Sequence, residues 1–181
     1  MNTPMKSGRN WYTVYTMPKA EKKVNDSLQR RNLDTFLPLY QKVVQRSDRK
    51  KKLWTPLFPG YVFINLNTME MDKVYGVPGV LRFISTQGKK DVIPDREIDV
   101  IRLLLKGKPE ITAARLSIGQ QVKVIHGPFV GLTGILMNYK GGNKLIVRLN
   151  TLNQNVAVEI SSDHVRPVEM SRSGETFCPT S

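Results

Sequence analysis

The chain has 181 residues and a mass of 20.6 kDa, which accommodates one domain or two small ones. Its 28 lysines and arginines outnumber the 15 acidic residues, so the formal net charge is +13 and the expected partner is a polyanion, most simply nucleic acid. Hydrophobic residues make up 40% of the chain, which argues against disorder, and no apolar run reaches the ~20 residues needed to cross a bilayer.

The compartment follows from two further features. The first residues lack the apolar core of a secretory signal, and the single cysteine, Cys178, cannot form an internal disulfide. The sequence therefore predicts a protein of the cytoplasm with no membrane association.

Strands and helices alternate over the first half of the chain, after a small polar tail over residues 1–10. A strand is predicted over Trp11–Thr16, because aromatic and β-branched residues fill it. A helix follows, from Pro18 in its first turn to Asn32, which can adopt the left-handed conformation that ends helices. Its apolar stripe has the spacing i, i+4, i+8 and consists of Ala20, Val24 and Leu28.

The rest of this half completes one domain. The predicted elements are two strands, a short helix, a strand and a longer helix, in the order Leu37–Arg46, Leu57–Leu66, Thr68–Val74, Val80–Ser85 and Asp95–Leu105. A charged loop joins the first two strands, Thr68 is the expected cap of the short helix, and Gly107 is the expected stop of the last helix. The order βαββαβα predicts an α+β sandwich over residues 11–106, with a mostly antiparallel sheet and helices packed against it.

The second half reads as a separate, smaller domain. Residues 107–115 carry Gly, Pro and small side chains without an apolar period, which predicts a linker. Residues 116–168 show five short alternating strands with glycine-rich turns. A small closed β-barrel is predicted, because closure buries the apolar faces of these strands and removes the free edges. Residues 169–181 are expected to be a frayed tail.

These segments resemble a known family. The opening WYTVYTMPKAEKKV, the strand LFPGYVFINL, the segment VPGVLRFI and the helix start IPDREID resemble an NGN domain, and residues 116–136 resemble a KOW motif. Together, over about residues 11–168, they resemble the NusG family of transcription elongation factors. The compact spacing between LPLYQKVVQ and LFPGYVFI resembles the specialised, RfaH-like antiterminators of polysaccharide loci.

The resemblance implies a fold and a set of partners. The fold would be an NGN α/β sandwich followed by a five-stranded SH3-like barrel, in a monomer without cofactors. The NGN domain would bind the clamp helices of the RNA polymerase β′ subunit, bridge to the opposite β lobe and suppress pausing. Specialised members also read non-template DNA, and the barrel recruits a ribosome or a termination factor.

The strand Leu57–Leu66 is the candidate polymerase contact. Alternation places Phe58, Val62 and Ile64 on one face of the strand and Tyr61 and Phe63 on the other. An uncovered second apolar face would be a partner site, whereas helices or the barrel could instead cover both faces. The positions that match the clamp-binding patch of the family are Tyr15, Phe58, Pro59, Tyr61 and Phe63.

Most of the basic excess lies in the first domain, in two clusters. The run Gln45–Lys52 is either a solvated hairpin tip or a contact to upstream DNA phosphates, through Arg49, Lys50, Lys51 and Lys52. No aromatic residue interleaves this run, so the sequence does not predict a base-stacking platform there. The first helix carries Lys19, Lys22 and Lys23, which are either a solvated face or DNA contacts. By resemblance, Lys23 matches a basic position that RfaH-like members use for non-template DNA.

No catalytic or metal site is predicted. One cysteine and the two histidines, His126 and His164, do not make a tetrahedral metal site, and no phosphate-binding loop is present. Two alternatives to an operon-specific antiterminator stay open: an RNA-binding or ribosome-associated KOW protein, and the general NusG factor. Glycines at positions 131, 134, 141 and 142 each disfavour a helix by ~1 kcal/mol, so the second domain is expected to be a permanent barrel.

Overall fold

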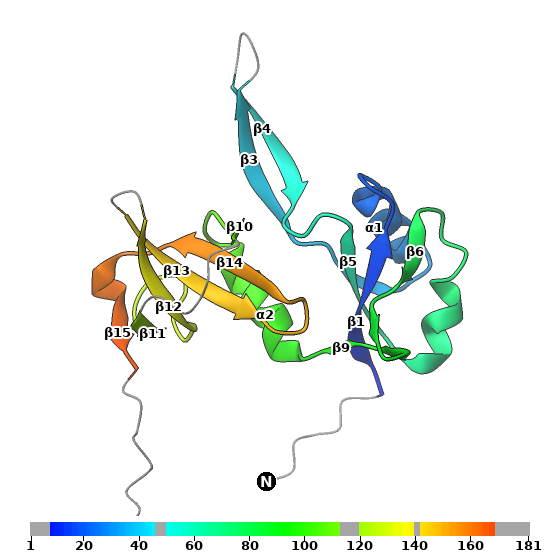
Figure 1. The fold of residues 1–181 in the computed structure, drawn as a ribbon. Coiled ribbons are helices and arrows are strands. Elements are labelled where there is room, and N and C mark those ends of the chain that lie inside the picture. Colours follow the sequence, from blue (N-terminus) through cyan, green and yellow to red (C-terminus); the bar gives the residue numbers. More distant parts are fainter. Residues whose placement is uncertain (1–7, 46–49, 113–119, 140–141, 169–181) are drawn as a thin grey trace, which may run out of the picture.

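The computed structural model describes residues 8–45, 50–112, 120–139 and 142–168 (Figure 1). An antiparallel sheet organises the first domain. Its strands lie in the order β2 (Asp34–Phe36), β5 (Tyr61–Leu66), β1 (Asn10–Thr16) and β6 (Val80–Phe83), and β9 (Val92–Ile93) also pairs with β1. The strand predicted over Trp11–Thr16 is confirmed as β1 at the centre of this sheet.

Helix α1 (Glu21–Arg30) covers the first face of the sheet, which presents Tyr12, Val14, Val62, Ile64 and Leu66. Val24 and Leu28 of α1 are fully buried against this face, as the apolar stripe predicts. The helix begins three residues later than expected, because Lys19 has a φ of 63° that no helical turn allows. Asn32 has a φ of 58°, which confirms its left-handed conformation after the helix end.

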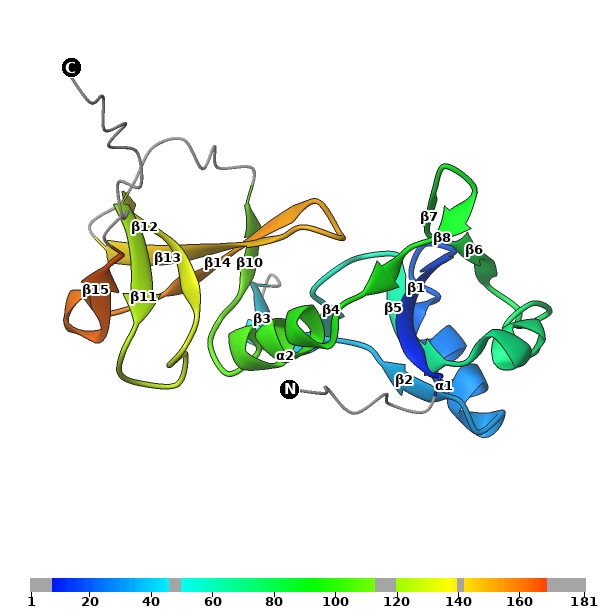
Figure 2. The same cartoon turned by 90° about the horizontal axis from the view of Figure 1, so that it is seen from below.

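Helix α2 (Asp95–Leu104) lies on the opposite side of the sheet, between the sheet and the second domain (Figure 2). This second face presents Trp11, Thr13, Tyr15, Tyr61 and Phe63. The Arg102 guanidinium carbon of α2 stands 5.8 Å from the Trp11 ring centre and 5.3 Å from that of Phe36. One apolar cluster therefore joins the second face, α2 and the second domain.

A two-stranded ribbon, β3 (Leu39–Gln45) with β4 (Lys50–Pro56), projects from the body of the domain (Figure 1). The expected charged loop is therefore wrong at Lys50–Lys52, which belong to a strand. Three successive lysines hide the strand pattern. Because β4 pairs with only one strand and has little buried surface, few apolar residues in the sequence indicate it. The Leu57 N–H donates to the Pro38 carbonyl at 2.8 Å and closes the base of the ribbon.

Short elements complete the first domain. Helix η1 (Thr68–Lys73) is capped by Asn67 rather than by Thr68, because Asn67 and Glu70 form a reciprocal capping box with bonds of 3.0 and 3.1 Å. Strands β7 (Ser85–Thr86) and β8 (Lys89–Lys90) form a small hairpin before β9. The helix predicted over Asp95–Leu105 is confirmed as α2.

The second domain is an antiparallel β structure, and the five strands that the sequence predicts are present. They are β11 (Gln120–Val124), β12 (Thr133–Tyr139), β13 (Gly142–Leu149), β14 (Gln154–Glu159) and β15 (Val165–Pro167). Strand β10 (Glu110–Thr112) extends the order to β10-β14-β13-β12-β11-β15, so part of the expected linker is a strand. Among the described residues of this domain, the one helical segment is η2 (Ser162–His164).

Candidate polymerase-binding and nucleic-acid surfaces

Tyr15 and Tyr61 form the accessible part of the predicted polymerase patch. They face each other across the β1–β5 pair, and their rings meet edge to face with centroids 5.7 Å apart. Both side chains are partly exposed, and Arg82 of β6 stands 5.9 Å from the centre of the Tyr15 ring. The pair therefore presents two aromatic rings and a cation at the edge of the second face.

The turn before β5 fixes the position of these rings. Gly60 has a φ of 82°, and a Cβ atom there would lie 2.9 Å from Cε2 of Tyr15. The Gly60 N–H donates to Oε1 of the buried Glu21 at 2.7 Å, while its carbonyl accepts from Thr16 N–H at 2.8 Å. Pro59 next to it is exposed. Glycine at position 60 thus lets the Tyr15 ring lie directly on the backbone of the turn.

Phe58 and Phe63 form the buried part of the patch. Their side chains are 2% and 0% exposed, and their ring centroids lie 6.0 Å apart. The expectation that Phe58 shares a face with Val62 and Ile64 is wrong. Phe58 precedes a turn, closed by a bond from Tyr61 N–H to the Phe58 carbonyl, so the alternation of β5 does not extend back to it.

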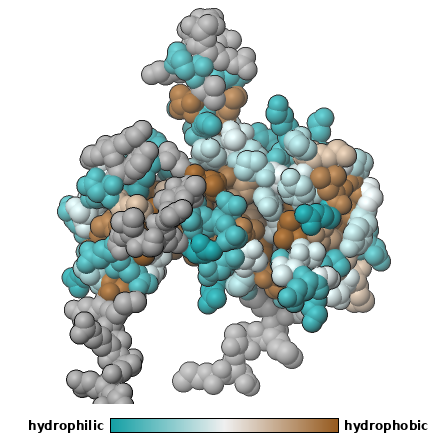
Figure 3. Space-filling model, in the orientation of Figure 1, coloured by the Kyte–Doolittle hydropathy of each residue, from teal (hydrophilic) through white to brown (hydrophobic). Residues whose placement is uncertain are grey.

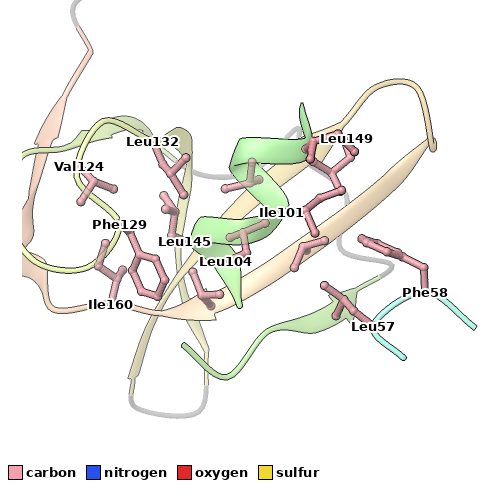
Figure 4. Packing of buried hydrophobic residues seen from close by; sticks show 14 of the residues in the cluster. Leu57, Phe58, Ile101, Leu104, Val124, Phe129, Leu132, Leu145, Leu149 and Ile160 are labelled. Atoms are coloured by element: carbon pink, nitrogen blue, oxygen red, sulfur yellow. The ribbon is translucent and has the colours of Figure 1, made fainter. Parts of the chain in front are cut away.

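Phe58 and Phe63 belong to one buried cluster with residues of α2 and the barrel. In Figure 4, Ile101 and Leu104 of α2 lie beside Leu145 and Leu149 of β13, with Leu57 and Phe58 at the edge of the same cluster. The Thr151 N–H of the barrel donates to the Glu97 carboxylate of α2 at 3.3–3.4 Å. For Phe58 and Phe63, the structure therefore agrees with the alternative in which the barrel helps to cover the second face.

A groove of about 850 Å³ remains open beside this contact. Tyr61 of β5 and Pro59 of the turn before it line one side, and Lys108 and Pro109 line it from the segment that leads into the barrel. Tyr40 and Lys42 add the base of the ribbon. The groove is the part of the predicted patch that a partner can reach in this arrangement.

The described basic residues of the prediction lie on α1, just before it, and on the ribbon. Lys19, Lys22 and Lys23 are exposed, as are Lys51 and Lys52 on β4, whereas Arg49 lies outside the described residues. The Lys22 ammonium donates to the Trp54 carbonyl at 2.7 Å. This bond joins the two basic clusters, which lie about thirty residues apart in the sequence, into one surface.

Sequence reasoning missed Trp54 as a surface residue. Its side chain is 55% exposed on β4, two positions after Lys52 and therefore on the same face of the ribbon. The signal was the alternation of Lys52 and Trp54, which becomes visible only when the lysine run is assigned to a strand.

Within the described residues, no helix is both long and apolar enough to cross a bilayer.

Known proteins similar to this chain point to one family. The family model described as "Transcription termination factor nusG" matches residues 9–102. The transcription termination/antitermination protein NusG of Pseudomonas aeruginosa is 30% identical over 179 residues, which cover 88% of this chain and 99% of that protein. The protein of the same name from Staphylococcus carnosus is 28% identical over 173 residues, which cover 87% and 94%. A solved structure on domain interaction in Thermotoga maritima NusG matches with a TM-score of 0.59 and 26% identity, covering 89% of this chain and 98% of that one. The chain therefore belongs to the NusG family of transcription factors.

Proposed function

We propose that this chain is a cytoplasmic elongation factor that binds RNA polymerase and promotes antiterminated transcription of specific operons. The single observation that carries the proposal is the aromatic groove of Pro59 and Tyr61, with Tyr15 against Tyr61, in a member of the NusG family. Exposed aromatic side chains in a groove are the groups that most often anchor protein interfaces. The partner at this groove would be the clamp helices of the β′ subunit, with the opposite β lobe as a second contact.

Phe58 and Phe63 take a different role from Tyr61 in this proposal. Because both are buried in the cluster shared with α2 and the barrel, they support the groove in the closed arrangement. Phe58 also lines the groove, whereas Phe63 is fully buried and would touch polymerase only after the cluster that covers it opens. The barrel would then be free to recruit its own partner, a ribosome or a termination factor.

The basic surface supports a contact to DNA. Lys22 and Lys23 on α1, with Lys19 just before the helix, would meet non-template DNA, and the run from Arg49 to Lys52 would meet upstream DNA phosphates. Phosphate contacts of this kind release counterions, so they strengthen binding most at low salt.

A second candidate is the general elongation factor, which acts on all operons. The names of the relatives favour it, because they describe transcription termination/antitermination proteins without an operon. Mapping polymerase occupancy across the genome with and without this protein separates the two. Changes confined to a few operons are expected, and changes on every operon would establish the general factor.

Binding to core polymerase tests the proposed contact. Tyr61→Ala should weaken binding by about thirtyfold, since an aromatic anchor contributes ~2 kcal/mol or more. Tyr75→Ala is the matched control, because Tyr75 is a half-exposed aromatic residue outside the groove. Phe63→Ala is a poor probe by itself, because emptying a fully buried site costs about 3–5 kcal/mol of folding stability.

Two outcomes would contradict the proposal. A folded Tyr61→Ala variant that binds polymerase as tightly as the parent chain would remove Tyr61 from the interface. Tight binding to structured RNA without any binding to polymerase would instead establish the RNA-binding or ribosome-associated protein. Thermal unfolding measured on each variant separates loss of contact from loss of fold.

A further inference from the structure

Strand β3 turns one of its edges toward the groove beside Tyr61. Successive side chains of a strand leave opposite faces, so a strand that lines a groove with one face contributes every second residue. Strand β3 instead contributes four consecutive residues, Tyr40 to Val43. Figure 1 places β3 on the side of the ribbon that faces the barrel, and Ile111 of β10 lines the groove from across it. One wall of the groove is therefore the edge of a strand.

The hydrogen-bond pattern of the ribbon shows which backbone groups lie on this edge. Leu57 N–H donates to the carbonyl of Pro38, which stands opposite it, so this pair is a hydrogen-bonded one. Bonded and non-bonded pairs alternate along an antiparallel ladder. The register therefore makes Gln41 and Val43 members of non-bonded pairs. Their N–H and C=O groups point away from β4, toward the groove.

The two outer edges of the ribbon differ in how they are covered. On β4, the carbonyl of Trp54, opposite Gln41, accepts from the Lys22 ammonium at 2.7 Å, as expected for a group that points away from β3. Pro56, two residues further along β4, has no N–H to offer. Within the described residues, the Gln41 and Val43 backbone groups receive no bond from outside the ribbon. Of the two edges, that of β3 is the open one.

The side chains around the open edge favour apolar and acidic residues in a partner. Val43 is 57% exposed and Ile111 is 41% exposed, and both line the groove. Figure 3 shows hydrophobic surface on the projecting ribbon between hydrophilic patches. Lys42 and Lys108 also line the groove, and none of the described lining residues is acidic. A segment that carries both apolar and acidic side chains would complement this lining.

The same charges argue against a second copy of this chain as the occupant. Strands β3 and β4 contain four lysines and no acidic residue, so two paired β3 edges would bring like charges together. Lysines on an edge strand are a common means of preventing such self-association. A helix offers no free backbone groups to the edge, because its own N–H and C=O groups are bonded within it. An extended acidic segment meets all these conditions.

We propose that the open edge of β3 binds an extended, acidic segment of a partner protein, which joins the ribbon as a third strand. Main-chain hydrogen bonds to Gln41 and Val43 would supply affinity, and Lys42 and Lys108 would select the acidic side chains. The inference concerns the β3 wall of the groove and needs neither polymerase nor Tyr61. Its failure would leave the proposed elongation function standing, and the reverse also holds, because peptide binding is measured without polymerase.

A labelled peptide of alternating valine and glutamate is the probe, with about eight residues to match the length of β3. Fluorescence anisotropy with the full-length chain should show saturable binding, and a valine–lysine peptide of the same length should not bind. Methylating the backbone nitrogens of all valines or of all glutamates blocks one edge of the peptide at a time. One of these two peptides should lose binding and the other should stay within about threefold, because an added strand bonds to β3 through a single edge.

Gln41→Pro blocks the edge on the protein side. It removes an N–H that the β3–β4 ladder does not use, and proline is tolerated at such positions of edge strands. Binding of the valine–glutamate peptide should weaken by about five- to tenfold, through the lost hydrogen bond. Gln41→Ala is the matched control, because it removes the side chain, keeps the N–H and should bind within about twofold of the parent chain. Equal thermal unfolding of the two variants excludes a folding defect.

Charge reversal tests the selection of acidic residues. Lys42→Glu should weaken binding of the valine–glutamate peptide by about five- to tenfold, because a like charge then faces its glutamates. Lys51→Glu makes the same change on β4, outside the lining of the groove. It should leave binding within about twofold at physiological salt, where exposed charges more than ~8 Å apart are largely screened.

Four results would overturn the inference. A parent chain that does not bind the peptide would show that the edge accepts no acidic strand. Equal losses in Gln41→Pro and Gln41→Ala would assign the contact to a side chain instead of the backbone. Dimerisation of the chain that Gln41→Pro abolishes would assign the edge to a second copy. If the peptide does not bind and Gln41→Pro weakens binding to core polymerase, the edge belongs to the polymerase contact.

Discussion

Gly60 combines two requirements that only glycine meets. Its φ of 82° lies in the left-handed region, and the Tyr15 ring occupies the space where a Cβ atom would stand. Gly88, in the hairpin between β7 and β8, has a similar φ of 78°, but a Cβ atom there would have no neighbour within 4 Å. The two glycines therefore differ in packing and share the same backbone requirement.

Alanine at these two positions separates packing from backbone strain. Gly88→Ala should lower the free energy of unfolding by about 1–2 kcal/mol through strain alone. Gly60→Ala should lower it by about 2–5 kcal/mol, because overlap with Tyr15 adds to the strain. Chemical denaturation measures both, and equal losses would show that Tyr15 moves aside freely. Gly60→Ala should also weaken polymerase binding, since the displaced Tyr15 ring packs against Tyr61 of the proposed groove.

At the scale of single elements, β10 is a strand of the second domain in a segment that the sequence predicted to be a linker. Glu110–Thr112 pair with Asn155–Ala157 of β14, although the local sequence has the composition of a linker. Three residues are too few to show an alternating pattern, so only the pairing partner defines the strand. Residues 110–112 of the predicted linker are therefore a strand.

Two fragments of the second domain test the contribution of β10. A fragment of residues 108–168 should resist denaturant better than one of residues 116–168, because only the longer fragment pairs the outer edge of β14. Circular dichroism should show strand content and no strong helical signal in either, since the glycines of the barrel disfavour helix. Equal stability would assign β10 no share in folding, and a helical spectrum would contradict a permanent barrel.

The sequence predicted those elements whose side chains are buried in a regular pattern. Val24 and Leu28 on α1, and Val122 and Val124 on β11, show the spacing of their elements because each is buried on one face. The lysines of β4 lack such a pattern, so β4 and its Trp54 surface were missed, although the first strand of the ribbon was predicted. The cover over Phe63 was left open for another reason: the contact between barrel and sheet depends on residues far apart in the chain.

For the molecule as a whole, the short segment from α2 to the barrel determines how the two domains are held together. A Cβ atom on Gly107 would lie 2.5 Å from Cζ of Phe129, a buried ring of the second domain. Leu105–Pro109 are the residues between α2 and β10, so the joint leaves little freedom for the two parts to separate. Close packing at Gly107 thus holds the barrel against the end of α2.

Gly107→Ala should loosen this joint, because the new methyl group forces the Phe129 ring to shift. The expected loss is about 1–3 kcal/mol in the free energy of unfolding, with a larger radius of gyration in small-angle scattering. Phe129→Leu is the matched second change, since a smaller side chain makes room for the methyl group. In a double-mutant cycle the combined loss should be smaller than the sum, and strictly additive losses would show that the two positions do not touch.

The short segment between α2 and β10 also determines how readily the second face of the sheet opens to a partner. Two parts of one chain that are connected by a few residues meet at an effective concentration in the millimolar range, so even a weak contact between them stays closed most of the time. An external ligand for Phe58 and Phe63 competes with that tethered neighbour, and its apparent affinity falls by the fraction of molecules that are open. Lengthening the segment between α2 and β10 would lower this local concentration and raise the apparent affinity, without altering a single residue of either surface.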